Sequence, residues 1–511
     1  MTGMPRRRFL AGATAAALAG PHLLRPTRAR GTSDGAGDCP IDHVVVLTME
    51  NRSFDHYFGS LSLVEGRDDV NGLTGGDEHN AWSSGEVVPT YRLSGTTCNR
   101  LDPPHEWESS RIQWGNGHND GYLRAVEHHY PEAADPATRP PDAADVMGYY
   151  VRSDLPFAYG ASDHFTICDN YFSPIGAPTL PNRHYLHCAT SGGLKDNYLD
   201  SRPKGATPSP QGDPTYGFDF RTIYQEMSEK GVDWRVYFAE APFTMLYRWP
   251  RLKHPKRFAP MAQLYADAAA GNLASFTTID PGYFTASDHA PQNVQLGQLF
   301  IASVYYALAA SPAWERTALI VTYDEDGGFY DHVPHLRGLP DERADDDLAE
   351  DFSKSGGRLP TMVLSPWARE GGVAHQEADH TSILAFAEWR FGLDALTDRD
   401  AARRKGSENP VDWFDFGQAA RPPVILPVPS FHVSMFTDCG STYVAPPAPY
   451  VPGPRTADNP SLDLNEALRL AIQAGAIPVL TSAETRRTQV TAFRMAEAAA
   501  SSGRIGSRLR V

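Results

Sequence analysis

The sequence predicts an α/β fold in which a central, mainly parallel sheet carries helices on both faces. Short apolar runs rich in β-branched residues recur along the chain, and amphipathic helical patterns separate them. Polar residues follow several of these runs directly. Because open α/β sheets bind ligands beyond the carboxyl ends of their strands, we expect the functional site at that edge.

The first expected strand covers residues 44–47, and Glu50 and Asn51 come just after it. A carboxylate and an amide at a strand end are suitable ligands for a cation or a polar substrate. The alternative interpretation is an acidic residue that starts a surface loop. This stretch alone does not decide between the two.

The later elements repeat the alternation of strand and helix. We expect strands over 234–238, 275–279, 318–322 and 362–364, with helices over 222–230 and 292–310. Chain length also permits two or three domains, although one elaborated α/β domain fits equally well.

Acidic residues gather after the expected strand 318–322. Asp324, Glu325 and Asp326 follow it, then two glycines, then Asp331 and His332. Like charges that lie close together repel, and a bound cation relieves the repulsion. The pattern therefore favours a functional site over simple solubilisation.

Prolines restrict the backbone around two further candidate residues. His105 follows a Pro pair, and Thr179 lies between Pro178 and a second proline, with Arg183 four residues beyond Thr179. A hydroxyl held in this way beside a guanidinium suits a nucleophile that attacks an oxyanion. The alternatives are a solvated loop histidine and a Pro-rich turn before a helix.

His289 follows the expected strand 275–279, and Asp379 and His380 precede an apolar helical pattern. Asp and His together form a compact pair of metal ligands. Thr381 or Ser382 can instead cap the helix, which gives this cluster a purely structural role. Both interpretations stay open.

The two ends of the chain differ from the middle. Residues 1–30 carry an Arg-Arg-x-Phe-Leu sequence before an Ala-rich segment without acids, as in a twin-arginine export signal. We assign 39–404 to the catalytic domain and 405–511 to a C-terminal extension. The extension contains a Pro-rich arm over 422–454 and helical patterns over 462–474 and 483–500.

Charge and cysteine usage limit the partners. Without the six arginines of residues 1–30, 40 basic residues face 62 acidic ones, a formal charge of −22. Such a chain is repelled by nucleic acid and by anionic lipid, so contact with a membrane surface should be transient and favour neutral headgroups. The five cysteines lack CxxC spacing, which argues against a cysteine zinc site, and one or two disulfides fit an exported protein.

The candidate residues suit metal-assisted displacement at phosphorus, because a cation polarises a phosphoryl oxygen and neutralises charge in the transition state. Six motifs in order resemble those of the bacterial phosphoesterase family, which holds non-specific phospholipases C and a related acid phosphatase within the alkaline-phosphatase-like fold. They are HVVVLTMENRSFDHYFG, DPPHEW, GAPTLPNRHY, DHAP, YDEDGGFYDHV and ADHTSILAFAEWRF, and they span about 39–393.

The resemblance implies a role for each candidate. The implied metal ligands are Glu50, Asn51, Thr179, Asp379 and His380. Thr179 would be the nucleophile, and His105, His289 and His332 would surround the phosphate, together with Arg183 as a substrate-binding residue. Oxygen ligands favour calcium or magnesium, whereas His380 leaves zinc or manganese open.

Two motifs depart from the family pattern. Asp288-His289-Ala290-Pro291 stands where EHPP is expected, and Asp326 stands where a His or Asn is expected. The first departure keeps the motif histidine. The second adds a carboxylate near the metal or the leaving group.

The leading hypothesis is a secreted or cell-envelope phospholipase C, exported by the twin-arginine machinery, that cleaves phosphodiesters such as phosphatidylcholine through a phosphothreonine intermediate. An acid-phosphatase-type phosphomonoesterase with the same site, acting on a small phosphoester, is the alternative. A more remote alternative is a lipid-binding protein that keeps the fold without catalysis.

Overall fold

The computed structural model describes residues 38–93, 98, 101–197, 206–207, 217–336, 341, 352–405, 409–439, 480 and 482–505. The predicted export signal over 1–30 and the helical pattern over 462–474 lie outside these residues.

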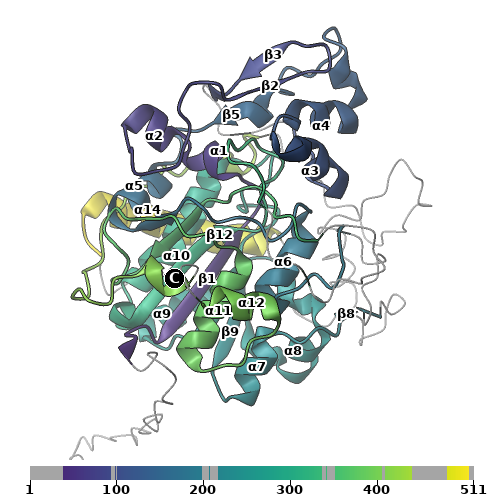
Figure 1. Cartoon of the computed structure of the whole chain (residues 1–511). Helices are drawn as coiled ribbons and strands as arrows, with labels where there is room; N and C mark the ends of the chain where they lie inside the picture. Colours follow the sequence, from purple (N-terminus) through teal and green to yellow (C-terminus); the bar gives the residue numbers. More distant parts are fainter. Residues whose placement is uncertain are drawn as a thin grey trace, which may run out of the picture.

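An eight-stranded sheet forms the centre of the described structure (Figure 1). Its strands run parallel from the first edge to β12, and β13 is antiparallel to both of its neighbours. The predicted α/β architecture with a mainly parallel sheet is therefore confirmed. In spatial order the strands are β10 (Phe258–Pro260), β9 (Trp234–Phe238), β11 (Phe276–Asp280), β1 (His43–Met49), β12 (Thr317–Tyr323), β13 (Thr361–Leu364), β6 (Thr166–Cys168) and β14 (Val373–Ala374).

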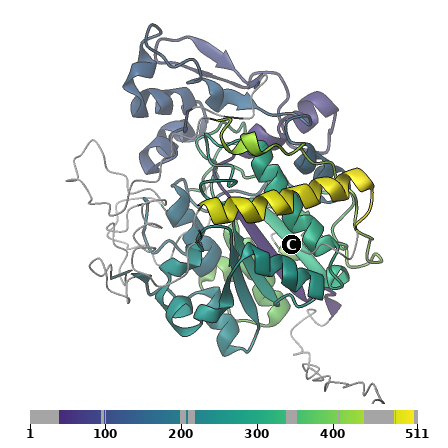
Figure 2. The same ribbon diagram turned by 180° about the vertical axis from the view of Figure 1, so that it is seen from behind.

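Helices cover both faces of this sheet, and the two views from opposite sides show one group on each (Figures 1 and 2). Every residue of β1 and of β12 is consequently buried, which explains why these strands are apolar on both faces. One group consists of α5 (Pro156–His164), α9 (Met261–Ala270), α10 (Val294–Ala309) and α14 (Ser482–Ser502). The other consists of α6 (Thr179–Cys188), α7 (Ile223–Glu229), α8 (Arg248–Lys253), α11 (His380–Phe391) and α12 (Asp398–Arg403).

A smaller module stands beyond one end of the sheet, at the top of Figure 1. It has its own apolar cluster, which includes Trp82, Tyr122 and Val126. The loop that carries His105 enters this module before α3. Helix α1 (Phe54–Phe58) packs in the main core, and α2 (Ser60–Glu65) follows it. The module contains β2 (His79–Ala81), β3 (Val87–Pro89), α3 (Trp107–Trp114) and α4 (Tyr122–His129). Two short pairs, β4 (Tyr91–Arg92) with β5 (Gly148–Tyr149) and β7 (Ala206–Thr207) with β8 (Gly217–Phe218), complete the strands.

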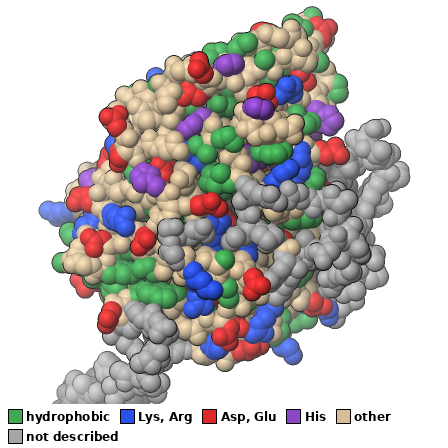
Figure 3. All heavy atoms as spheres, viewed as in Figure 1, with side chains coloured by type: hydrophobic (Ala, Val, Ile, Leu, Met, Phe, Trp, Pro, Cys, Tyr) green, Lys and Arg blue, Asp and Glu red, His purple; other side chains and the backbone are tan. Residues whose placement is uncertain are grey.

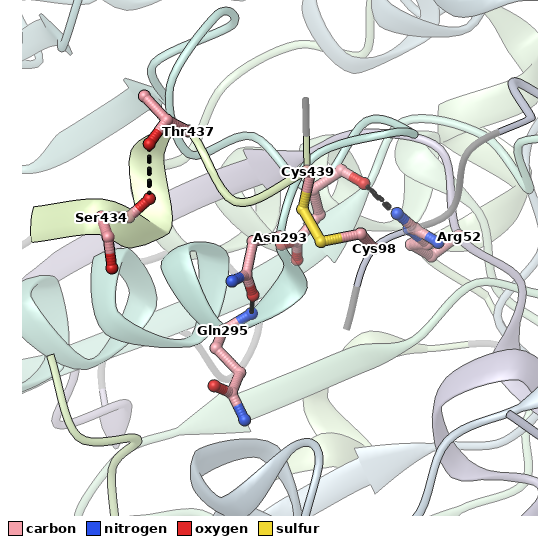
Figure 4. Close-up of a disulfide and its surroundings, with 8 residues drawn as sticks. Arg52, Cys98, Asn293, Gln295, Ser434, Thr437 and Cys439 are labelled. Carbon is pink, nitrogen blue, oxygen red and sulfur yellow. Dashed lines mark hydrogen bonds between the residues drawn. A yellow bond between two sulfur atoms is a disulfide. The ribbon is translucent and has the colours of Figure 1, made fainter. Parts of the chain in front are cut away.

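Described residues after 405 pack onto the helices of the central sheet. The hydroxyl of Tyr305 donates to the carbonyl of Val424, and that of Tyr306 donates to the carbonyl of Leu426 (2.7 Å each). The described part of the arm contains the short helix η10 (Val433–Phe436), and α14 crosses α10 (Figure 2). A disulfide joins Cys98 to Cys439, a pairing that the spacing of the cysteines did not indicate (Figure 4).

Acidic and basic side chains are interspersed over the face seen in Figure 3. None of the helices in the described ranges combines the length and apolar character that a bilayer crossing requires.

Candidate active site

Three neighbouring parallel strands deliver polar residues to one edge of the sheet. Met49 of β1 pairs with Tyr323 of β12, so Glu50 and Asp324 leave adjacent strands side by side. On the other side of β1, strand β11 ends in Asp280. The expected location of the site at the carboxyl ends of the strands is thus where the carboxylates gather.

Arg183 of α6 joins these strand ends. The guanidinium Nε lies 2.9 Å from Oδ2 of Asp324, and Nη1 lies 3.2 Å from Oδ1 of Asp280. Nη2 lies 3.6 Å from Oε1 of Glu50. The remaining N–H groups donate to the hydroxyl of Tyr283 and to two carbonyls of β1.

The Arg183 side chain is fully buried, and acceptors from the protein surround its five N–H groups. Contact with a substrate would require some of these bonds to break. The geometry therefore favours a role in holding carboxylates together, while the substrate-binding role stays a prediction.

Thr179 is the first residue of α6, directly after Pro178, and only 2% of it is exposed. It precedes Arg183 by one helical turn, so both side chains lie on the same face of the helix. Because Arg183 is fixed to the strand-end carboxylates, Thr179 is directed to the same edge of the sheet. The positive end of the helix dipole favours an anion at this position.

Buried negative charge accumulates around these residues. Burial and the charge of Asp324 raise the pKa of Glu50 to about 7, although Arg183 opposes the shift. Burial, together with Asp326 and Asp324, raises the pKa of Glu325 well above its ordinary value. The protein's own cations leave this cluster incompletely neutralised.

Two buried oxygen atoms in the cluster are candidate ligands for a cation. Among the described residues, neither Oδ1 of Asn51 nor Oε1 of Glu325 has a hydrogen-bond partner. Oε1 of Glu325 lies 3.7 Å from Nε2 of His105, and Nδ2 of Asn51 lies 3.3 Å from the same nitrogen. Oxygen atoms of this kind, next to Glu50 and Asp324, form a donor set that suits a divalent cation.

The backbone around Asn51 is shaped for this arrangement. Asn51 has φ +61°, in the left-handed region that asparagine tolerates, and its N–H donates to Oδ1 of Asp324 at 3.2 Å. Gly327 and Gly328 also have positive φ, and a Cβ atom on them would lie 2.3 Å from the carbonyl oxygen of Asn51 and 2.4 Å from that of Pro104, respectively. The two glycines let the acidic turn pack against both loops.

His105 and His289 come together at this site, with ring centroids 5.9 Å apart. Nδ1 of His105 lies 2.6 Å from the carbonyl oxygen of Pro103, and Nδ1 of His289 lies 2.7 Å from that of Ala290. Burial opposes protonation of both rings, but nearby acids, Asp102 first among them, outweigh it and raise the pKa of both.

His332 lies in a different cluster. Its Nδ1 is 2.6 Å from Oδ2 of Asp55, and its Nε2 is 3.1 Å from Oδ1 of Asn71. Arg358 binds the carboxylates of Asp55 and Asp331 at 3.0 and 2.8 Å. These contacts give His332 a place in a buried ion-pair network, and its predicted contact with phosphate stays untested.

Asp379 caps α11. Its Oδ1 accepts hydrogen bonds from both the N–H and the hydroxyl of Thr381, and its Oδ2 lies 2.7 Å from Arg399 and 3.0 Å from Arg403. Both carboxylate oxygens are therefore occupied. The N-cap is therefore Asp379, so the prediction of Thr381 or Ser382 as the cap is wrong, although Ser382 completes a capping box by accepting a hydrogen bond from the N–H of Asp379.

Both ring nitrogens of His380 also have hydrogen-bond partners. Nε2 lies 2.8 Å from the carbonyl oxygen of Asp324, and Nδ1 lies 3.0 Å from the hydroxyl of Tyr171. Hydrogen bonds of this kind do not distinguish Asp379 from Asp324, whose two carboxylate oxygens also accept hydrogen bonds. Metal ligation by Asp379 and His380 therefore remains a prediction. Asp324 and Glu325 follow β12 directly and lie beside Glu50 and Asn51, which follow β1.

Both departures from the family motifs have structural partners. Oδ2 of Asp288 accepts hydrogen bonds from Tyr57 and Tyr323 at 2.9 and 2.7 Å. The carboxylate of Asp326 accepts from the N–H groups of Gly328 and Gly357, which closes the acidic turn.

Comparisons with known proteins show which family the chain belongs to. A model of the phosphoesterase family matches residues 41–394. Phospholipase C B of Mycobacterium tuberculosis (strain ATCC 25618 / H37Rv) is 33% identical over 452 residues, covering 76% of this chain and 82% of that protein. Non-specific phospholipase C1 of Arabidopsis thaliana is 31% identical over 385 residues, covering 71% and 69%.

Solved structures that match part of this chain include a protein in the alkaline phosphatase superfamily from Vibrio parahaemolyticus, with a TM-score of 0.31 and 12% identity over 52% of this chain and 66% of that one. Human ectonucleotide pyrophosphatase/phosphodiesterase 5 has a TM-score of 0.32 and 12% identity over 51% and 94%. The family match covers the whole sheet and every candidate residue of the site. The chain belongs to the phosphoesterase family and is a hydrolase of phosphoric esters.

Proposed function

We propose that the protein is an exported, metal-dependent phospholipase C that hydrolyses phosphodiesters such as phosphatidylcholine to diacylglycerol and a phosphorylated headgroup. The names of the relatives from Mycobacterium tuberculosis and Arabidopsis thaliana support this activity. A transient contact with a lipid surface and export by the twin-arginine machinery belong to the same proposal.

Glu50, Asn51, Asp324 and Glu325 would hold a divalent cation, together with Thr179. The oxygen-rich set favours calcium, magnesium or manganese over zinc. When bound, such an ion acts as a Lewis acid on a phosphoryl oxygen and lowers the pKa of a coordinated hydroxyl. The two buried oxygens without partners, on Asn51 and Glu325, support this assignment.

In the first chemical step, Oγ1 of Thr179 attacks phosphorus and the bond to the diacylglycerol oxygen breaks. One imidazole of the His105–His289 pair accepts the threonine proton, and the other, protonated, gives its proton to the departing oxygen. The raised pKa of both rings suits the acid role. The product of this step is a phosphodiester that links Thr179 to the headgroup.

In the second step, water attacks the same phosphorus atom. The imidazole that lost its proton accepts one from the water, and the other imidazole returns the threonine proton as the bond from phosphorus to Thr179 breaks. The phosphorylated headgroup leaves, and the enzyme returns to its starting state.

A single observation carries the proposal: Arg183 holds the strand-end carboxylates of Asp324 and Asp280 and lies one helical turn from Thr179. A hydroxyl at the N-terminus of a helix is thereby directed to a buried, oxygen-rich edge that also contains His105 and His289.

The test compares Thr179→Ala and Thr179→Ser on nitrophenyl phosphate and on its phosphocholine diester. Thr179→Ala should abolish turnover of the preferred substrate with the fold intact, whereas Thr179→Ser should retain part of it, because serine keeps the hydroxyl. Full activity of Thr179→Ala would contradict the mechanism. Faster cleavage of the monoester would favour the phosphatase alternative, and vesicle binding without cleavage of either substrate would favour the lipid-binding protein.

A further inference from the structure

The disulfide between Cys98 and Cys439 connects distant parts of the chain, with a sequence separation of 341 residues and a Cα–Cα distance of 5.4 Å. Cys98 belongs to the segment that leads to His105, and Cys439 ends the described part of the C-terminal arm. The bond therefore ties the extension to the neighbourhood of the site.

Cys98 also contacts the second histidine loop. It forms an isolated antiparallel bridge with Asn293, which lies beside the disulfide in Figure 4. Asn293 caps α10 by accepting a hydrogen bond from the N–H of Gln295, and it follows His289 by four residues. The Cys98–Asn293 bridge thus joins the loop of His105 to the loop of His289.

The loop of His289 is internally well held. The N–H of Gln292 donates to the carbonyl of His289 at 2.8 Å, and its side chain binds the N–H of Ser287 and the carbonyl of Tyr283 at 2.8 and 2.6 Å. A movement of Asn293 would consequently be transmitted to His289 through this short turn.

The C-terminal arm has anchors that do not depend on the disulfide. Phe431 and Phe436 pack on Phe493 of α14, with ring centroids 5.5 and 6.3 Å apart. Tyr305 and Tyr306 of α10 donate hydroxyl hydrogen bonds to backbone carbonyls of the arm. Because these contacts hold the arm without the disulfide, loss of the disulfide should change the position of Cys98 and leave the arm in place.

We propose that the Cys98–Cys439 disulfide is a positioning element of the active site, which fixes the bridge between the loops of His105 and His289. The proposal rests on the function proposed above. A chain that folds in a reducing compartment and is exported in folded form would acquire this bond only after export. There the two thiols are oxidised by thiol–disulfide exchange with an extracytoplasmic disulfide donor, whose own S–S bond breaks and which leaves as the dithiol. Full activity would therefore appear only outside the cytoplasm.

The test uses the full chain in its oxidised and reduced forms, with Cys98→Ser and Cys439→Ser as variants that lack the bond. Steady-state kinetics on the phosphocholine nitrophenyl diester should show a loss in kcat of about tenfold to a hundredfold, since a misplacement of about 1 Å can cost about 10²-fold. KM should change much less. Hydrogen exchange should accelerate in peptides that contain 101–106 and 287–293, but not in the arm over 424–436.

Phe436→Leu is the matched control, because it weakens the anchor of the arm and keeps the disulfide. It should lower Tm and leave kcat unchanged. The proposal is overturned if both serine variants and the reduced enzyme keep full kcat and show only a lower Tm, since the disulfide would then stabilise the fold without positioning the active site. It is also overturned if reduction releases the arm. Hydrogen exchange tests the role of the disulfide without any measurement of activity. The proposed function is tested separately with Thr179→Ala, so its failure can be distinguished from failure of the disulfide proposal.

Discussion

Replacing Arg183 with methionine should destabilise the protein strongly. The guanidinium is fully buried and lies 2.9, 3.2 and 3.6 Å from the carboxylates of Asp324, Asp280 and Glu50. Removing one partner from a buried ion pair typically costs about 3–5 kcal/mol, because the other charge remains uncompensated. We therefore expect the free energy of unfolding to fall by about 3–5 kcal/mol in chelator.

The deficit should depend on pH. Arg183 lowers the pKa of Glu50, which burial raises to about 7, so the pKa of Glu50 rises further in the variant. A carboxylate whose folded pKa lies above its unfolded value destabilises the fold as pH rises from the unfolded pKa to the folded one. The loss should accordingly be smaller at pH 5.5 than at pH 8.

Urea denaturation of wild type and Arg183→Met at these two pH values measures the effect. Arg183→Met combined with Asp324→Asn is the control, and it should recover part of the stability because one uncompensated charge is gone. The result that refutes the reasoning is a loss below about 1 kcal/mol, as found for surface ion pairs, together with a large rise in KM. Arg183 would then act on the substrate rather than on the carboxylates.

Two further substitutions, the second with a matched control, test other parts of the structure. His332→Gln should lower Tm more at pH 6 than at pH 9. Burial opposes protonation of His332, but the charge of Asp55 outweighs burial and raises the pKa of the imidazole. The stabilising charge on His332 is therefore present at low pH and is lost as pH rises through the folded pKa. The kcat of this variant should stay near that of wild type. A large loss of kcat would instead support the predicted contact of His332 with the phosphate. Gly327→Ala should cost roughly 1–3 kcal/mol at φ +66° and also weaken cation binding, since its Cβ would meet the carbonyl of Asn51. Gly392→Ala is the control, because Gly392 has φ +64° and no described atom lies within 4 Å of the added Cβ. It should lower stability and leave cation binding unchanged. Equal effects of Gly327→Ala and Gly392→Ala on cation binding would contradict the proposed packing.

Local patterns were sufficient to predict most of the sheet. The strand predicted over 44–47 is β1 (His43–Met49), and the one over 234–238 is β9 without change, because buried parallel strands require continuous apolar runs. The helix over 222–230 is α7, with Thr222 as its N-cap. The helical pattern over 483–500 is α14.

Side-chain partners from distant segments could not be predicted in this way. Asp379 has residue types around it that suit either a cap or a metal site, and the two arginines that occupy its carboxylate come 20 and 24 residues later. Arg183 likewise finds its carboxylates on three separate strand ends. The acidic run after β12 predicts a cation site, which stays a prediction, and which of its members lie near Asn51 depends on the paired glycines and on the register of β1 with β12.

The most direct test of the account is a calorimetric titration of the chelator-treated protein with calcium and with manganese. Wild type should bind a divalent cation, Glu325→Gln should lose most of that affinity, and Asp379→Asn should bind with unchanged affinity despite a lower Tm. Retained binding in Glu325→Gln, together with its loss in Asp379→Asn, would contradict the placement of the cation beside Glu50, Asn51 and Asp324.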